Sequence, residues 1–252
     1  PTAIAADPIG ATSFTANWNA VEGADSYELD VYEKTANNAA DLFISEYVEG
    51  SSNNKYIEIF NGTGADINLS DYELRAYNNG STTADASNDL TGTLTNNATK
   101  VYKNSLAAIY TGSATAGSAL AFNGDDAIAL YKKSTSAFVD IFGRIGNDPG
   151  TAWTGTGGYT TLDKTLVRKS NVLGGITVSP TGTGSSAFNT LTTEWDLYNI
   201  DTITDLGSHT FDGGSVITYK IQNQNVGNVT SYEVTGLNPE TEYFYVVRAK
   251  SG

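Results

Sequence analysis

The chain from position 231 to position 249 reads SYEVTGLNPETEYFYVVRA, with the alternation of apolar and polar residues that is typical of half-buried β-strands. The same alternation occurs near the other end of the chain, in SFTANW at 13–18 and SYELDVY at 26–32. Neither half has enough strands to bury a core alone, so we expect the two halves to meet in space. The residues between them then form an inserted domain whose own ends lie close together.

These patterns predict an all-β chain made of one β-sandwich interrupted by a second β-sandwich. The first domain is expected to consist of residues 1–36 and 214–252, and the inserted domain of residues 37–213. We expect Trp18 to anchor the core of the first domain. No segment longer than about ten residues keeps a helical period, so any helix should be one or two turns long.

Alternation continues through much of the inserted part. Strands are expected at 42–48, 56–61 and 71–77. Residues 80–98 are rich in Thr, Asn, Ser and Asp and predict a long exposed loop. The glycine-rich stretch 143–161 predicts an irregular but anchored segment.

Composition limits the classes of partner and chemistry. The net charge is −14, which would repel a phosphate backbone at long range, so nucleic acid is not an expected partner. The chain contains no Cys, which excludes disulfides, thiolate metal sites and cysteine nucleophiles. The chain has no run of roughly 18 apolar residues, the length that would predict a membrane span. Because the chain begins at Pro1 and has no Met, we expect it to be part of a longer protein whose neighbouring domains are its partners.

The two ends of the chain resemble a fibronectin type III domain. The resemblance rests on Trp18, on SYELDV at 26–31 and on LNPETEY at 237–243. The last stretch is similar to the family's tyrosine corner, in which a Tyr hydroxyl bonds to the backbone a few residues upstream. The resemblance implies a β-sandwich whose third strand is followed by the insertion.

The middle of the chain resembles the lamin tail domain of secreted bacterial proteins, including extracellular nucleases and large adhesins. The motifs that carry this resemblance are ISE at 44–46, YIEIFN at 56–61, INLSDYEL at 67–74, NGDDAIAL at 123–130, VDIFG at 139–143 and TLVRK at 165–169. The resemblance implies an immunoglobulin-like sandwich in a secreted or cell-surface protein of Bacteroidetes-type bacteria. It implies a non-catalytic structural or adhesive module, with an accessory module that binds polysaccharide or DNA for a secreted hydrolase or nuclease as the alternative.

The sequence offers little for catalysis. His209 is the only histidine, and no glycine-framed serine accompanies it, so we expect it to pack rather than to act as a base. Asp125 and Asp126 are adjacent and would point to opposite faces of a strand, which is unsuitable for an acid/base pair. We therefore expect no enzyme activity.

Calcium is the one metal that the sequence suggests. Asp125 and Asp126 in NGDD, and Asp148 in GNDPG, lie in loops that offer carboxylate and carbonyl oxygens, the ligands that calcium prefers. The alternative is that these side chains accept hydrogen bonds from nearby backbone amides and stabilise turns.

Two hypotheses concern ligand binding. Trp153, Tyr159 and Tyr102 are candidate ring platforms for a polysaccharide, although aromatic side chains of an all-β domain are more often core residues. The candidate contacts for a nucleic acid are four basic residues, Lys164, Arg168, Lys169 and Arg144, with Trp153 and Tyr159 as stacking surfaces. On an alternating strand Lys164 and Arg168 would share one face and Lys169 would take the other.

Overall fold

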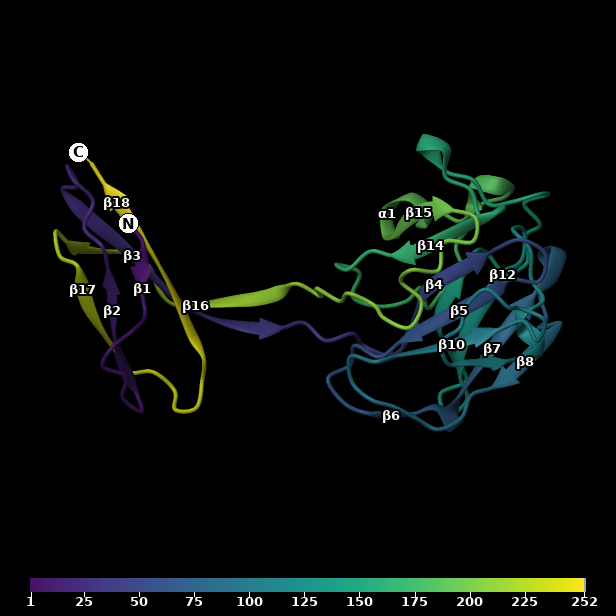
Figure 1. Cartoon of the computed structure of the whole chain (residues 1–252), viewed down its shortest axis with the longest axis horizontal. Coiled ribbons are helices and arrows are strands. Elements are labelled where there is room, and N and C mark those ends of the chain that lie inside the picture. Colours follow the sequence, from purple (N-terminus) through teal and green to yellow (C-terminus); the bar gives the residue numbers. More distant parts are fainter. Residues whose placement is uncertain (252) are drawn as a thin grey trace. The chain divides into compact units, whose positions relative to one another are not determined.

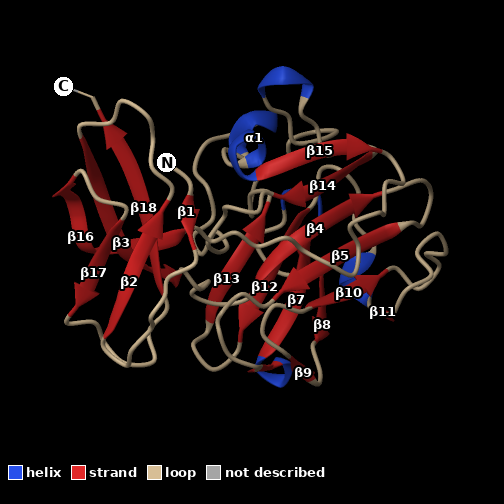
Figure 2. Cartoon of the chain, turned by 60° about the vertical axis from the view of Figure 1, so that its left-hand side comes forward, coloured by secondary structure: helices blue, strands red, loops and turns tan. Residues whose placement is uncertain are grey.

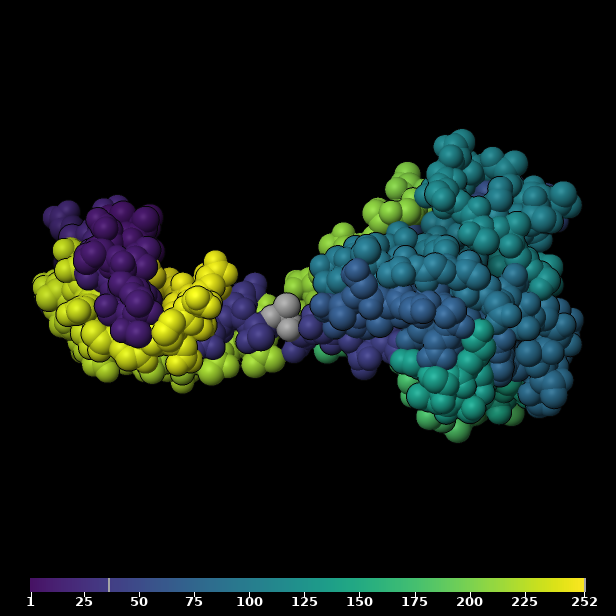
Figure 3. Space-filling model, turned by 90° about the horizontal axis from the view of Figure 1, so that it is seen from below, coloured from purple at the N-terminus to yellow at the C-terminus, as the bar shows by residue number. Residues whose placement is uncertain are grey.

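The computed structural model describes residues 1–251, with the backbone alone described at position 36. These residues form two compact units, one made of Pro1–Asn37 together with the chain from Gly214 onward, and one made of Asn38–Gly213. In the space-filling view, residues from both ends of the colour scale build the first unit and intermediate residues build the second (Figure 3). The chain therefore passes from one unit to the other twice, at 37–38 and at 213–214.

The first unit contains two antiparallel sheets of three strands each (Figure 1). One sheet has the order β1 (Ala3–Ile4), β2 (Ser13–Trp18), β17 (Ser231–Thr235), and the other has the order β16 (Ser215–Gly227), β3 (Ser26–Ala36), β18 (Tyr243–Lys250). Each sheet combines strands from both ends of the chain. The two ends are therefore parts of one fold.

The core of the first unit is also shared between the two ends. Trp18 is 2% exposed, and its ring centroid lies 5.7 Å from that of Tyr27. Val234 and Val247, from the C-terminal part, belong to the same buried cluster. The prediction that Trp18 anchors this core is confirmed.

Cleavage between positions 37 and 40 should leave residues 1–37 bound to the rest of the chain. The reason is that β2 and β3 hold both backbone pairing and core contacts with β16, β17 and β18. The measurement is size-exclusion chromatography after insertion of a specific protease site, under native conditions and in denaturant. Separate elution of the short fragment under native conditions would show that the N-terminal half is not part of the fold.

The second unit contains a six-stranded sheet, a four-stranded sheet and a short two-stranded ribbon (Figure 2). The six-stranded sheet has the order β11 (Ala114–Ala116), β10 (Thr99–Lys103), β5 (Lys55–Phe60), β4 (Phe43–Glu49), β14 (Lys164–Arg168), β15 (Trp195–Asn199). The four-stranded sheet has the order β13 (Ala137–Phe142), β12 (Ala127–Lys132), β7 (Tyr72–Tyr77), β8 (Ala86–Asp89), and the ribbon pairs β6 (Ile67–Asn68) with β9 (Thr93–Leu94). The β10–β11 pair is parallel, and the other named pairs are antiparallel.

The main core lies between the two larger sheets of the second unit. Ile44 and Ile57 from one sheet and Leu74 and Ile128 from the other are all fully buried in one cluster. Strands β4 and β5 are buried along their whole length, so their second face is covered as well. The chain is thus all-β, as predicted, and the six-stranded sheet is covered on both faces at its central strands β4 and β5.

Helical structure is confined to single turns, as expected. The only α-helix in residues 1–251 is α1 (Leu191–Glu194). Short 3-10 turns occur at Leu69–Asp71, Asn78–Gly80, Ser118–Leu120, Thr156–Gly158 and Ser185–Ala187. Within the described part of the chain, no helix has the length and apolar character required to cross a membrane.

The prediction of a long exposed loop at 80–98 is wrong. Strand β8 pairs with β7 in this stretch, β9 pairs with β6, and Leu90 and Leu94 are buried. The sequence did not predict these two strands because they contain many polar residues, whose side chains occupy the outer face. The stretch 143–161 is irregular and anchored, as predicted, by fully buried Trp153.

Candidate functional site

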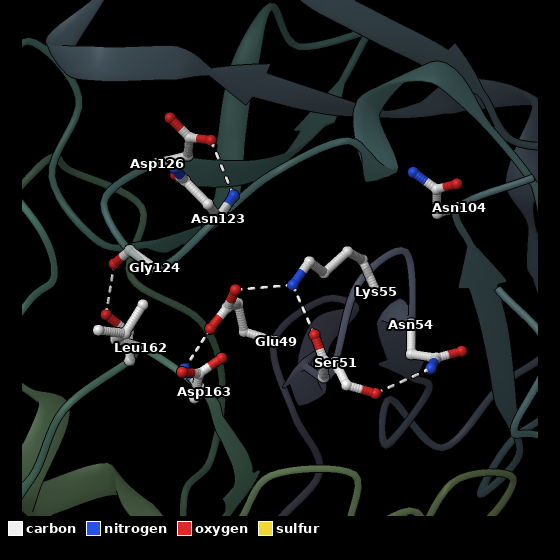
Figure 4. Close-up of polar contacts among 12 residues, drawn as sticks. Glu49, Ser51, Asn54, Lys55, Asn104, Asn123, Gly124, Asp126, Leu162 and Asp163 are labelled. Atoms are coloured by element: carbon white, nitrogen blue, oxygen red, sulfur yellow. Dashed lines mark hydrogen bonds and ion pairs between the residues drawn. The ribbon is translucent and has the colours of Figure 1, made fainter. Parts of the chain in front are cut away.

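The candidate site lies where β4 ends and β5 begins, beside the loops at 123–126 and 161–163 (Figure 4). Lys55 Nζ lies 2.7 Å from Glu49 Oε1 and donates a hydrogen bond of 2.6 Å to the carbonyl of Gly50. The second oxygen of Glu49 accepts a hydrogen bond from the Asp163 amide. Glu49 is 3% exposed and Lys55 9%, so this ion pair ties the β4–β5 turn to the chain before β14.

Asp126 uses both of its carboxylate oxygens to hold neighbouring backbone. One accepts from the Asn79 amide at 2.9 Å, and the other from the Asn123 amide at 3.0 Å. Burial raises the pKa of Asp126, and these amide hydrogen bonds oppose that rise. Asp126 therefore closes a turn and connects it to the chain after β7.

Asp125 is 7% exposed and points one oxygen, Oδ1, into the protein without a hydrogen-bond partner among the described residues. Burial raises its pKa, and the neighbouring charge of Asp126 raises it further. Asp148 accepts a 2.7 Å hydrogen bond from the Gly150 amide, the geometry of a turn-capping aspartate.

The calcium hypothesis for Asp125, Asp126 and Asp148 stays a prediction. In residues 1–251, no group of three or more His, Cys, Asp or Glu side chains is arranged to hold a metal ion. Asp126 and Asp148 accept hydrogen bonds from backbone amides, as the alternative of turn stabilisation expects.

Trp153 is not a ligand platform. It is fully buried, and its indole Nε1 donates to the carbonyl of Asp126 at 3.4 Å. Tyr102 is 2% exposed and belongs to the same core. Both rings fill space between the sheets, so neither has a face for a sugar or a base, and the prediction for Trp153 is corrected. Tyr159 is half-buried against this core and donates its hydroxyl to the carbonyl of Trp195 at 3.2 Å.

Arg168 is not a nucleic-acid contact either, because its side chain is 0% exposed. Its guanidinium makes two hydrogen bonds with Asp140, at 2.8 and 3.3 Å, and lies 4.6 Å from the centre of the Trp195 ring. Since Arg168 is on β14 and Asp140 on β13, the pair connects the two sheets. Asp140 also accepts from the amides of Ile44 and Ile176, at 2.8 Å each.

His209 packs, as predicted. Its ring lies 5.8 Å from Phe43 and 4.9 Å from Phe60, and burial lowers its pKa to about 4, with the charge of Arg168 contributing. Its Nε2 has no hydrogen-bond partner in the described structure, so it is not paired with a serine or a carboxylate as a catalytic base would be. The nearby Ser208 hydroxyl donates to the backbone of Asp205 instead.

The first unit holds a pocket of about 440 Å³ between β2 and β18. Phe14, Leu237 and Tyr245 contribute much of its apolar wall, and Glu240 is the one charged side chain that lines it. A single carboxylate among apolar groups and hydroxyls is not an arrangement for acid/base or nucleophilic catalysis.

Sequence reasoning missed a row of aromatic side chains in the first unit. Tyr219 on β16, Tyr32 on β3 and Phe244 on β18 are partners in register, with ring centroids 5.9 and 5.8 Å apart. They lie on the outer face, since they alternate with buried residues such as Val31, and Tyr219 is 43% exposed. Alternation in the three strands could have indicated that these side chains lie on the outer face. Their position side by side depends on the register of the strands, which the sequence does not show.

Residues 35–146 match the family model described as Lamin Tail Domain. No curated protein and no solved structure matches the chain. Lamin tail domains are immunoglobulin-like and non-catalytic, in agreement with the packing and turn-closing roles of the side chains described above. The resemblance of the inserted unit to a lamin tail domain is therefore confirmed over residues 35–146, which include β4 to β13.

Proposed function

We propose that this chain is a non-catalytic structural or adhesive module of a larger secreted or cell-surface bacterial protein. In this proposal a fibronectin type III-like unit presents an inserted lamin-tail unit, and the partners are neighbouring domains of the same longer protein. The lamin-tail match supports the non-catalytic part. The extracellular location is inferred from the resemblance to secreted bacterial modules.

One observation carries the presentation role. Strands β3 and β16 remain paired up to Ala36, just before the chain enters the second unit, and Ser215, just after it leaves that unit (Figure 1). The inserted unit is therefore joined to the first through two neighbouring, hydrogen-bonded strands. A two-stranded connection resists twisting and stretching better than a single flexible linker, which suits a part that displays another.

Two features support a fibronectin type III-like first unit. Its six strands form two facing three-stranded sheets, with the insertion after the third strand. The Tyr243 hydroxyl accepts a 3.2 Å hydrogen bond from the amide of Asn238, five residues upstream, as a tyrosine corner would.

A second candidate function is an accessory module that binds polysaccharide for a secreted hydrolase. The outer-face row Tyr219–Tyr32–Phe244, in which Tyr219 is 43% exposed and the other two are half-buried, favours it, because its rings offer apolar area and its two tyrosines add a polar tip. Val246 and Ile217, 41% and 46% exposed, lie on neighbouring positions of the same strands. The net charge of −14 favours neutral polysaccharide over DNA as the ligand.

Incubation of the intact chain with insoluble neutral polysaccharides and with duplex DNA tests both functions. A presentation module should remain in the supernatant and should hydrolyse none of these polymers. If a polysaccharide removes the wild-type protein from the supernatant, and Tyr219→Ala abolishes this binding while Tyr198→Ala does not, the accessory function is favoured. Tyr198 is the matched control because its exposure, 39%, is similar. Hydrolysis that survives repurification would overturn the non-catalytic proposal.

A further inference from the structure

Residues 200–211, here called the cover segment, follow β15 and lie on the outer face of the six-stranded sheet. Near its middle, Leu206 packs with Val48 and Tyr56. At its end, Phe211 packs with Phe43 and Phe60. Two apolar contacts therefore hold the segment on the sheet, with a gap between them along the strands.

Two glutamates occupy this gap beneath the cover segment. Glu46 on β4 and Glu58 on β5 stand opposite each other in register and are 1% and 0% exposed. Glu58 accepts hydrogen bonds of 2.6 Å from the Ser45 hydroxyl and of 2.6 Å from the amide of Gly207 in the cover segment. The carboxyl group of Glu58 is thus a direct attachment point for the cover segment.

Glu46 has no such support. Both of its carboxylate oxygens are buried and have no hydrogen-bond partner among the described residues. Burial raises its pKa to about 9, and the charges of Glu58 and Asp205 add to the rise. Burial likewise raises the pKa of Glu58 to about 7, although its hydrogen bonds oppose the rise.

The titratable groups that interact with this pair are Asp205 from the cover segment, Tyr198 from β15 and Tyr110 from the chain after β10. Arg168, Asp196 and His209 line the neighbouring cavity, and the guanidinium of Arg168 is paired with Asp140 rather than with either glutamate. Among residues 1–251, no Lys or Arg forms an ion pair with Glu46 or Glu58. Ionisation of both glutamates would leave two like charges side by side in a dry interior, which is costly unless water enters.

We propose that the cover segment is a pH-gated lid, which stays closed on the sheet while Glu46 and Glu58 are protonated and opens when they ionise. A cavity of about 240 Å³, lined by Arg168, Asp196, Asp205 and His209 among others, lies beside the segment. In this proposal water enters from that side when the segment opens. The segment leads to the second crossing at 213–214, so its opening lengthens the free chain at that crossing.

The sign of the pH effect follows from linkage. Each glutamate binds its proton more tightly in the closed form than in water, where the ordinary pKa is 4.5. Each protonated glutamate therefore stabilises the closed form fully below pH 4.5. As the pH rises, this stabilisation is lost progressively, up to about pH 7 for Glu58 and up to about pH 9 for Glu46. His209 acts in the opposite direction at acid pH, because its pKa is lowered to about 4 and the closed form excludes its proton.

The test is hydrogen exchange of the Gly207 and Ser208 amides in the intact chain between pH 5 and 9, corrected for intrinsic exchange. In the wild type, the opening constant should rise by up to about tenfold per pH unit between pH 7 and 9, the slope for one linked proton. Glu46→Gln, which mimics the protonated acid, should abolish the rise in this range. Glu73→Gln, the same change at a half-buried glutamate of β7, should preserve it.

A second measurement does not depend on any variant. Carbon-13 NMR of the glutamate carboxyl groups in the wild type should show Glu46 titrating above pH 7. An unchanged pH dependence in Glu46→Gln, or a Glu46 carboxyl that titrates near pH 4.5, would overturn the proposal. If Glu46→Gln does not fold, the carboxyl titration and the pH dependence of amide exchange in the wild type decide together, and a pH-independent opening constant would overturn the proposal.

Discussion

Replacement of Arg168 by methionine should lower the free energy of unfolding of the second unit by about 3–5 kcal/mol. The substitution keeps much of the volume but leaves Asp140, which is 0% exposed, without its cation. The two amides that also bond to Asp140 do not supply a full opposite charge. Removal of one partner of a buried ion pair lowers stability for this reason, because the remaining charge is left uncompensated, whereas the intact pair adds little net stability.

Urea unfolding followed by circular dichroism measures this loss. A matched control is Lys133→Met, because Lys133 pairs with Asp89 at 2.7 Å but the two side chains are 39% and 71% exposed. That exposed pair should contribute no more than about 1 kcal/mol. A loss for Arg168→Met as small as that of the control would mean that water reaches Asp140, and the role of the pair in joining the sheets would be wrong.

Replacement of Trp153 by alanine should cost about 3–5 kcal/mol in the free energy of unfolding. Trp153 is fully buried, lies 6.5 Å from the ring of Phe188, and anchors a segment that has little regular structure of its own. Removal of the indole would open a large cavity between the sheets and would remove the donor to the Asp126 carbonyl. The melting temperature should fall by about 2–4 °C for each kcal/mol lost in a unit of this size.

Calorimetry of the intact chain measures the change. Leu106→Ala is a suitable control, because Leu106 is 70% exposed and its truncation should have little effect. A variant at Trp153 that melts like the wild type would contradict the core role and would restore the interpretation of this residue as a surface ring.

The two-part first unit was predictable because its signals are local. Alternation in the three stretches 13–18, 26–32 and 231–249 corresponds to four strands of the structure: β2, β3, β17 and β18. Trp18 stands among apolar neighbours in such a strand and is buried as expected. The lamin-tail motifs were equally local, and the family match includes those between 44 and 143.

The candidate site residues were not predictable in the same way. Trp153 and Arg168 are residue types that serve both as ligand contacts and as buried anchors, and the sequence does not state their exposure. Arg168 is buried because Asp140 on β13 meets it from the other sheet, at a separation of 28 residues. The loop aspartates were recognised, but which backbone amides they accept from depends on how the loops meet.

Sequence alone determined the all-β class, the placement of both halves of the first unit and the short helices, because alternation and turn residues act between near neighbours. The tertiary structure decided which face each side chain occupies. Strict alternation would place Glu46 on the same face as Ile44, but a register shift between them sends Ile44 into the core and Glu46 to the opposite face beneath the cover segment. One extra residue in a strand reverses every side chain beyond it, and only the pairing with β5 reveals where that reversal occurs.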